Sequence, residues 1–251
     1  MARYGSSYSY QLGPGPVTPA VKTLLVVNVV VWLVNLLVPA LTMRLGLSPR
    51  DVFTGFAFWQ PFTYMFLHDT GGFSHILFNM LALWMFGTEL ERMWGSRFFY
   101  KYYVITGVGA GVTTLLLSLV SNGIYYSLTV GASGAIYGLL LAWAMYFPNR
   151  TIYFYFLFPI PARVFVIIIG AIAFLSSFGG PGSGVAHIAH LGGLVVGYLY
   201  LKSLRGGPFE EIKYRWLRWK MDRARNRFDV YSGGKSDDDD DWRREWKKHI
   251  H

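Results

Sequence analysis

The chain has 251 residues, of which 53% are hydrophobic and only 15% charged, with a formal net charge of +9 and a mean hydropathy of +0.33. These proportions lie far from those of an ordinary soluble domain and indicate an integral membrane protein. Cysteine is absent, which excludes a disulfide framework, a thiolate nucleophile and a zinc–thiolate site.

Apolar runs of membrane-spanning length, separated by Gly, Pro and charged residues, predict an all-α membrane protein with six transmembrane helices. The first run is interpreted as a retained anchor, because its apolar core exceeds the roughly 7–15 residues of a signal-peptide core. The predicted domains are an amino-terminal tail at 1–20, a membrane domain at 21–204 and a carboxy-terminal tail at 205–251. In chain order, the predicted helices are Val21–Leu41, Phe73–Glu91, Phe98–Leu119, Ala132–Phe147, Arg163–Ser177 and Val185–Leu204.

The connection at 43–72, between the first two predicted helices, is too long and too aromatic for a simple linker. Its rings suit anchors at the membrane interface, and a lateral belt without chemistry is the alternative interpretation. The aromatic residues are Phe53, Phe56, Phe58, Trp59, Phe62, Tyr64 and Phe66.

Basic residues are concentrated at the carboxy-terminal end, where 14 of the 23 Lys and Arg residues follow position 201. Because basic segments stay in the cytoplasm, the tail is predicted to be cytoplasmic, and six crossings place the amino terminus on the same side. Aromatic and basic side chains alternate over 211–231. This mixture favours contact with anionic membrane lipid over RNA binding, so no nucleic-acid partner is expected.

A serine and a histidine lie inside two of the predicted helices, Ser133 in the fourth and His190 in the sixth. Polar groups in hydrocarbon are costly and therefore indicate function. Each is followed by two glycines four residues apart, which let two helix backbones approach closely. Contact between these faces would put the hydroxyl beside the imidazole, and an imidazole can take a hydroxyl proton during attack on a carbonyl. The glycine pairs are Gly134/Gly138 and Gly193/Gly197.

Further polar residues lie near the same predicted depth. His75 and Asn79 are four residues apart and share one face of the second helix. His187 is an alternative base to His190, although the glycine spacing favours His190. The histidines also raise the alternative of a metal site. No HExxH pattern is present, and no Asp or Glu occurs between Glu91 and Glu210, so neither a metal nor a cofactor is predicted.

The order of these segments resembles that of the rhomboid intramembrane serine proteases, over roughly 21–204. The resemblance implies a six-helix rhomboid-like bundle whose active site opens to the outer side of the membrane, as in prokaryotic plasma-membrane members. The main matching segments are His75–Asn79, Gly131–Gly134 and Ala189–Gly193 with Gly197, and the supporting ones are Leu45–Pro49, Trp59–His68 and Phe158–Pro161.

The resemblance also implies a role for each matching residue. Ser133 resembles the nucleophile and His190 its general base, without a third carboxylate. The other implied roles are the side-chain oxyanion hole at Asn79 and His75, the ring beneath the catalytic imidazole at Tyr137, and the small residue beside the nucleophile at Gly131.

The predicted function is a serine endopeptidase that cleaves transmembrane proteins through an acyl-enzyme. There are two alternatives. The first is a noncatalytic rhomboid-like protein that binds membrane clients, and the second, less favoured, is a proton-coupled transporter that uses the histidines as relays.

Overall fold

The computed structural model describes residues 14–154, 158–178 and 185–204. The predictions about the carboxy-terminal tail, including its lipid contact, fall outside these ranges. Contacts divide the chain into two units, Met1–Leu201 and Lys202–His251. The site and the helices described below belong to the first unit, except for residues 202–204 at the end of the last helix.

Each of the six predicted ranges contains helix, with nearly the expected bounds. By length and composition, α1 is the described helix that is long and apolar enough to cross a bilayer, whereas α9 and α10 are apolar but shorter. The number of membrane crossings therefore stays a prediction. The long helices are α1 (Pro19–Leu37), α5 (Phe73–Ala82) continued by η2 (Leu83–Gly87) and α6 (Thr88–Trp94), α7 (Ser96–Ser118), α9 (Ser133–Tyr146), α10 (Ala162–Ser177) and α11 (Val185–Leu204).

Short elements fill the connections. The segment between the first two long helices holds α2 (Ala40–Leu45), α3 (Pro49–Thr54), α4 (Gln60–Thr63) and the 3-10 turn η1 (Tyr64–Phe66), and α8 (Asn122–Tyr125) follows α7. An antiparallel hairpin, which the sequence analysis did not predict, precedes α10. Its strands are β1 (Thr151–Phe154) and β2 (Phe158–Pro161), paired from Thr151↔Pro161 to Phe154↔Phe158.

The second predicted helix contains a π-turn, η2, which the sequence did not reveal. One extra residue in a helical turn rotates everything that follows about the helix axis. The residues of α5 and those of α6 can therefore face different neighbours although they belong to one rod. The rod extends beyond Glu91, the predicted end, to Trp94, and it stops at Gly95, where φ is +76°. That backbone conformation favours glycine.

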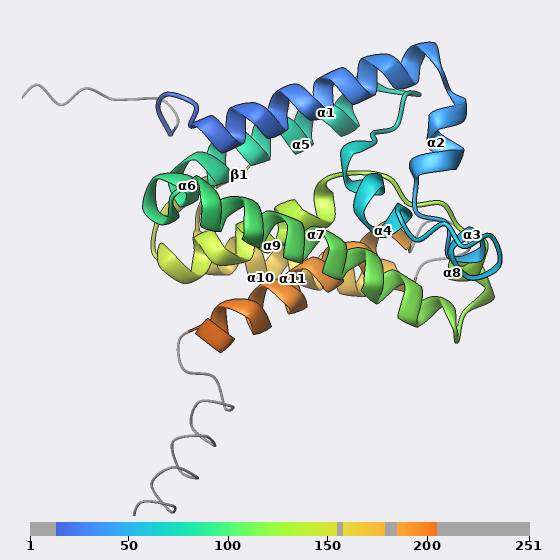
Figure 1. The fold of residues 1–251 in the computed structure, drawn as a ribbon. Helices are drawn as coiled ribbons and strands as arrows, with labels where there is room; N and C mark the ends of the chain where they lie inside the picture. Colours follow the sequence, from blue (N-terminus) through green and yellow to red (C-terminus); the bar gives the residue numbers. More distant parts are fainter. Residues whose placement is uncertain (1–13, 155–157, 179–184, 205–251) are drawn as a thin grey trace, which may run out of the picture. The chain divides into compact units, whose positions relative to one another are not determined.

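Helix α7 lies at the centre of the packing. It runs along α9 and also contacts α6, α4 and α1, and Figure 1 shows α1 beside α5 at one edge of this group. Glycines of α9 and α11 allow these two helices to approach α7 closely. A Cβ added at Gly138 of α9 would lie 2.7 Å from Cβ of Thr106, and one at Gly192 of α11 would lie 3.0 Å from Cα of Ala110.

The carboxylate of Glu91 closes the start of α1. It accepts hydrogen bonds from the N–H groups of Ala20 and Val21, both at 2.9 Å, and from the hydroxyl of Thr18. The hydroxyl of Ser96 at the start of α7 donates to the same carboxylate at 2.6 Å. Glu91 is 3% exposed. An anion at a helix amino terminus satisfies unpaired N–H groups and the helix dipole together.

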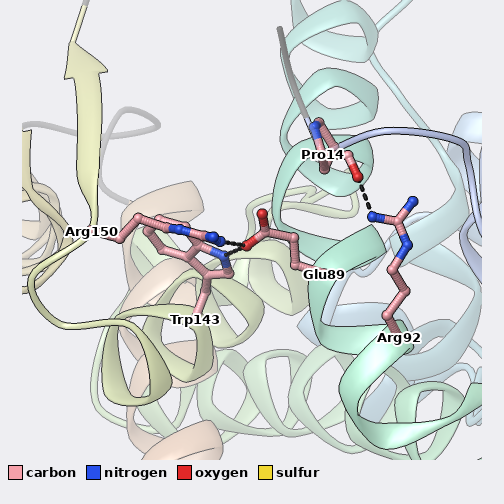
Figure 2. A network of polar contacts seen from close by, with 5 residues as sticks. All are labelled: Pro14, Glu89, Arg92, Trp143 and Arg150. Atoms are coloured by element: carbon pink, nitrogen blue, oxygen red, sulfur yellow. Dashed lines mark hydrogen bonds and ion pairs between the residues drawn. The ribbon is translucent and has the colours of Figure 1, made fainter. Parts of the chain in front are cut away.

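Two further side chains of α6 point to different sides of the helix, as Figure 2 shows. Glu89 accepts a hydrogen bond from the indole N–H of Trp143 at 2.7 Å and forms an ion pair with Arg150. Arg92 donates to the carbonyl oxygen of Pro14. The charged end of this helix thus binds α9, the connection to β1 and the segment before α1.

For the connection at 43–72, the structure corrects part of the prediction that its aromatic rings are anchors at the membrane interface. Large rings at its surface, including Phe56 and Phe58 at 69% and 70% exposure, agree with anchors at an interface. Tyr64 is different, because it is 1% exposed and its hydroxyl donates to the carbonyl oxygen of Gly107 at 2.7 Å. Phe66 is also partly buried. The Tyr64 ring faces α7 and α9, because a Cβ added at Gly111 or Gly134 would lie 3.1 Å from one of its atoms. Phe66 packs against the hydrophobic core and the ring of Phe62.

Candidate active site

The serine occupies the first position of α9, and the preceding loop holds it there. Gly131 has φ of +127°, and its N–H donates to the carbonyl oxygen of Tyr64 at 3.0 Å. Two residues earlier in the loop, Thr129 forms two backbone hydrogen bonds with Leu47, both of 2.9 Å. Since the first helical bond of α9 runs from the N–H of Ile136, the N–H of Ser133 has no partner within its helix.

Helices α9 and α11 meet at their glycines, as their spacing predicts. A Cβ added at Gly193 would lie 1.9 Å from the carbonyl oxygen of Gly134, and one at Gly197 would lie 3.3 Å from Cα of Gly138. No side chain other than hydrogen fits at the first of these contacts. The backbones therefore approach closely enough for short side chains on the two helices to meet.

The predicted contact between Ser133 and His190 is present. Nε2 of His190 lies 2.8 Å from Oγ of Ser133, which is within hydrogen-bond distance. The imidazole stacks on the ring of Tyr137, with centroids 4.1 Å apart and planes inclined by 4°. Nδ1 of His190 is buried and has no hydrogen-bond partner among the described residues. Stacking, rather than a carboxylate, orients the ring.

His75 and Gly131 border the serine from α5 and the loop. A Cβ added at Gly131 would lie 3.0 Å from Nε2 of His75 and 3.6 Å from Oγ of Ser133. The glycine thus leaves open the space that both polar atoms face. Asn79 is 7% exposed, and its side-chain N–H donates to the carbonyl oxygen of His75 at 2.7 Å. Because an amide has two such hydrogens, a second donation remains available to Asn79.

The rhomboid-domain family matches residues 55–206, which include every residue of this site. The chain belongs to the rhomboid family. The prediction made from its motifs is confirmed, and a rhomboid is an integral membrane protein.

Three curated relatives illustrate the similarity. The mitochondrial Rhomboid protein 1 of Saccharomyces cerevisiae is 34% identical over 135 residues, covering 51% of this chain and 37% of that protein. Rhomboid protease GluP of Bacillus subtilis is 34% identical over 148 residues, covering 58% and 26%. Rhomboid protease AarA of Providencia stuartii is 32% identical over 154 residues, covering 56% and 54%. The matches therefore span only part of these relatives.

In this rhomboid, a backbone group that sequence reasoning missed contacts His75. The N–H of Asp69 donates to Nδ1 of His75 at 3.2 Å. His68 is 1% exposed and packs edge-on against His75, with ring centroids 5.2 Å apart. Burial, together with the neighbouring His75 ring, lowers the pKa of His68 to about 3. A main-chain donor leaves no pattern in the sequence, so the contact between the N–H of Asp69 and His75 could not be predicted.

The alternative base, His187, packs against the imidazole of His190. The two rings meet edge-on, with centroids 5.6 Å apart, and it is His190 that forms the hydrogen bond with Ser133. Within the described residues, no group of three or more His, Asp or Glu side chains could hold a metal ion.

Proposed function

We propose that the chain is an intramembrane serine endopeptidase with Ser133 as nucleophile and His190 as general base. The observation that carries this proposal is the 2.8 Å separation between Oγ of Ser133 and Nε2 of His190 on two helices of a rhomboid domain. The substrates are other transmembrane proteins, cut within or next to their membrane segments. Two relatives, GluP and AarA, are named rhomboid proteases, which supports the proposal.

In the first step, Oγ of Ser133 attacks the carbonyl carbon of the scissile peptide while Nε2 of His190 takes the hydroxyl proton. The carbonyl carbon becomes tetrahedral and its oxygen carries the negative charge. Collapse breaks the C–N bond, and the proton on Nε2 passes to the leaving amine. Water, deprotonated by the same nitrogen, then attacks the ester carbon. The bond between this carbon and Oγ breaks, the proton on Nε2 returns to Oγ, and the carboxylic acid leaves.

The oxyanion would lie over Gly131, which Nε2 of His75 and Oγ of Ser133 border. The free N–H of Ser133 at the start of α9 is one donor, and the partial positive charge of the helix amino terminus supports it. Nε2 of His75 and the side-chain N–H of Asn79 complete the set. Because the dyad lacks a carboxylate, these donors matter more, and one such donor is commonly worth about 3 kcal/mol.

The protein would cross the membrane six times, with both termini and the basic tail in the cytoplasm and the serine in the outer half of the bilayer. Helix α9 has 14 residues and is therefore about 21 Å long, shorter than a hydrocarbon core of about 30 Å. A serine at its first residue then lies below the outer surface. A substrate helix must unwind locally to expose its peptide bond, so helix-breaking residues near the cut would favour cleavage.

The test uses the full chain in liposomes with a single-span reporter protein and a fluorophosphonate that labels activated serines. We expect Ser133→Ala to lose both labelling and cleavage, and His190→Ala to lose cleavage while keeping its helical circular dichroism. Ser127→Ala is the matched serine control, because the hydroxyl of Ser127 bonds the carbonyl oxygen of Ile124 in a loop. It should behave as the wild type.

His187→Ala separates the two candidate bases. It should retain cleavage, since the ring of His187 contacts the imidazole and not the serine. Cleavage by purified Ser133→Ala would overturn the proposed mechanism. Wild-type protein that binds the reporter but neither cuts it nor takes the label would instead favour a noncatalytic client-binding rhomboid.

A further inference from the structure

We propose that Trp32 and the Asp69 peptide are positioning residues that hold His75 with its Nε2–H directed at the oxyanion site. This inference rests on the proposed protease function, in which His75 donates to the oxyanion. For His75 to donate there, its ring must carry the hydrogen on Nε2 and not on Nδ1. Neutral imidazole has one protonated nitrogen, and its partner decides which one.

The peptide N–H of Asp69 determines which ring nitrogen of His75 is protonated. It lies 3.2 Å from Nδ1 of His75 and can donate a hydrogen bond but never accept one. If Nδ1 were protonated, two N–H groups would face each other at this distance. The contact therefore favours the tautomer with a bare Nδ1 and a hydrogen on Nε2. A water molecule at the same place would impose no such preference, because it both donates and accepts.

Nε2 is the nitrogen that faces the site. It lies 3.0 Å from the position a Cβ would take on Gly131, beside the serine hydroxyl. The selected tautomer thus presents a donor where negative charge would develop. The opposite tautomer would present a lone pair there and would repel an oxyanion.

The loop that carries the Asp69 peptide is itself held from both sides. The indole N–H of Trp32, on α1, donates to the carbonyl oxygen of Asp69 at 3.1 Å. The Trp32 ring also meets Phe73, the first residue of α5, edge-on with centroids 5.9 Å apart. Within the loop, a carboxylate oxygen of Asp69 accepts the N–H of Gly71 at 3.0 Å. Helix α1 therefore acts on His75 through the backbone of one residue, Asp69, whose carbonyl oxygen binds Trp32 and whose N–H binds the ring. It supplies no group to the serine.

The first experiment reads the tautomer directly and needs no activity. Full-length protein is labelled with nitrogen-15 in histidine, and the His75 signals are assigned by their loss in His75→Gln. At a pH where the ring is neutral, protonated and bare ring nitrogens have widely separated shifts. We expect a protonated Nε2 in the wild type. Replacing the Asp69 amide by an ester, which exchanges the N–H for oxygen, should mix the two tautomers.

The second experiment measures reporter cleavage by Trp32→Phe, which keeps an aromatic ring near Phe73 but removes the indole donor. We expect kcat to fall about 3- to 10-fold, the effect of losing one ordinary hydrogen bond, with KM within about twofold. Trp59→Phe is the matched control. Its indole N–H also donates to a carbonyl oxygen, that of Arg44 at 2.9 Å, but this peptide does not touch His75. Its kcat should be unchanged.

The outcomes separate the two proposals. A protonated Nδ1 in the wild type, or a tautomer unaffected by the ester, would overturn the positioning role even if cleavage is normal. Equal losses in both Trp variants would also overturn it, because they would indicate general destabilisation. An enzyme that never cleaves, yet shows the expected tautomer, would refute the protease function and leave the Asp69 contact standing.

Discussion

Substitution of Gly193 by alanine should abolish the proposed cleavage, although Gly193 is not one of the proposed catalytic residues. The added Cβ would lie 1.9 Å from the carbonyl oxygen of Gly134, whereas Cβ contacts in proteins essentially never fall below 3.0 Å. Because the obstacle is backbone, α9 and α11 must move apart by about 1 Å. The 2.8 Å contact between the dyad atoms then passes the hydrogen-bond limit of about 3.2 Å. A misplacement of this size can cost about 100-fold in rate.

The assay compares kcat for reporter cleavage and the midpoint of thermal unfolding in detergent. Gly170→Ala is the matched control, since a Cβ there would meet the side chain of Leu194 at an ordinary 3.4 Å. Alanine gains up to about 1 kcal/mol over glycine in a helix, so this control should be active and slightly more stable. At Gly193, overpacking of about 1–3 kcal/mol should outweigh that gain. Wild-type kcat and stability in Gly193→Ala would refute the reasoning.

Two further changes test the support of the dyad and the buried His68. Tyr137→Leu removes the ring on which the His190 imidazole stacks and should lower kcat about 10-fold, the upper range for an aromatic pair; Tyr137→Phe should keep most activity, and equal rates for the two would contradict the stacking role. With the pKa of His68 lowered by burial to about 3, the folded protein binds no proton there at pH 5, whereas the unfolded chain, with a pKa of about 6.5, does. Stability should therefore fall by about 2 kcal/mol from pH 7 to pH 5 through this residue. His68→Leu should remove that part of the pH dependence in equilibrium unfolding, and an unchanged slope would count against a buried neutral ring.

The parts of the site that could be predicted are the polar side chains whose burial in the hydrocarbon of a membrane costs free energy. A serine or histidine in an apolar run is conspicuous because hydrocarbon penalises it. The glycines beside Ser133 and His190 identified the two faces that meet, because only missing side chains permit that approach. Helix positions followed for the same reason, since apolar length and glycine or proline breaks dictate them.

The parts that could not be predicted depend on backbone geometry. The π-turn at Leu83–Gly87 has no composition that differs from an ordinary apolar helix. The donation from the Asp69 N–H uses a group that every residue except proline carries. Tyr64 was misassigned because an aromatic ring near the membrane interface can face lipid or protein equally well, and only the direction of η1 decides. Such features become visible once the chain is folded.

The carboxylate of Glu91 affects how this protein partially unfolds. The same two oxygens bind the first turn of α1 and the hydroxyl of Ser96 at the beginning of α7. Partial unfolding that frees α1 removes the donors of Thr18, Ala20 and Val21 from this buried charge and leaves it the hydroxyl of Ser96. The resulting penalty should weaken the connection between α6 and α7 as well. Hydrogen exchange at the ends of these two helices should consequently be coupled, with both protected or both lost in a single cooperative event.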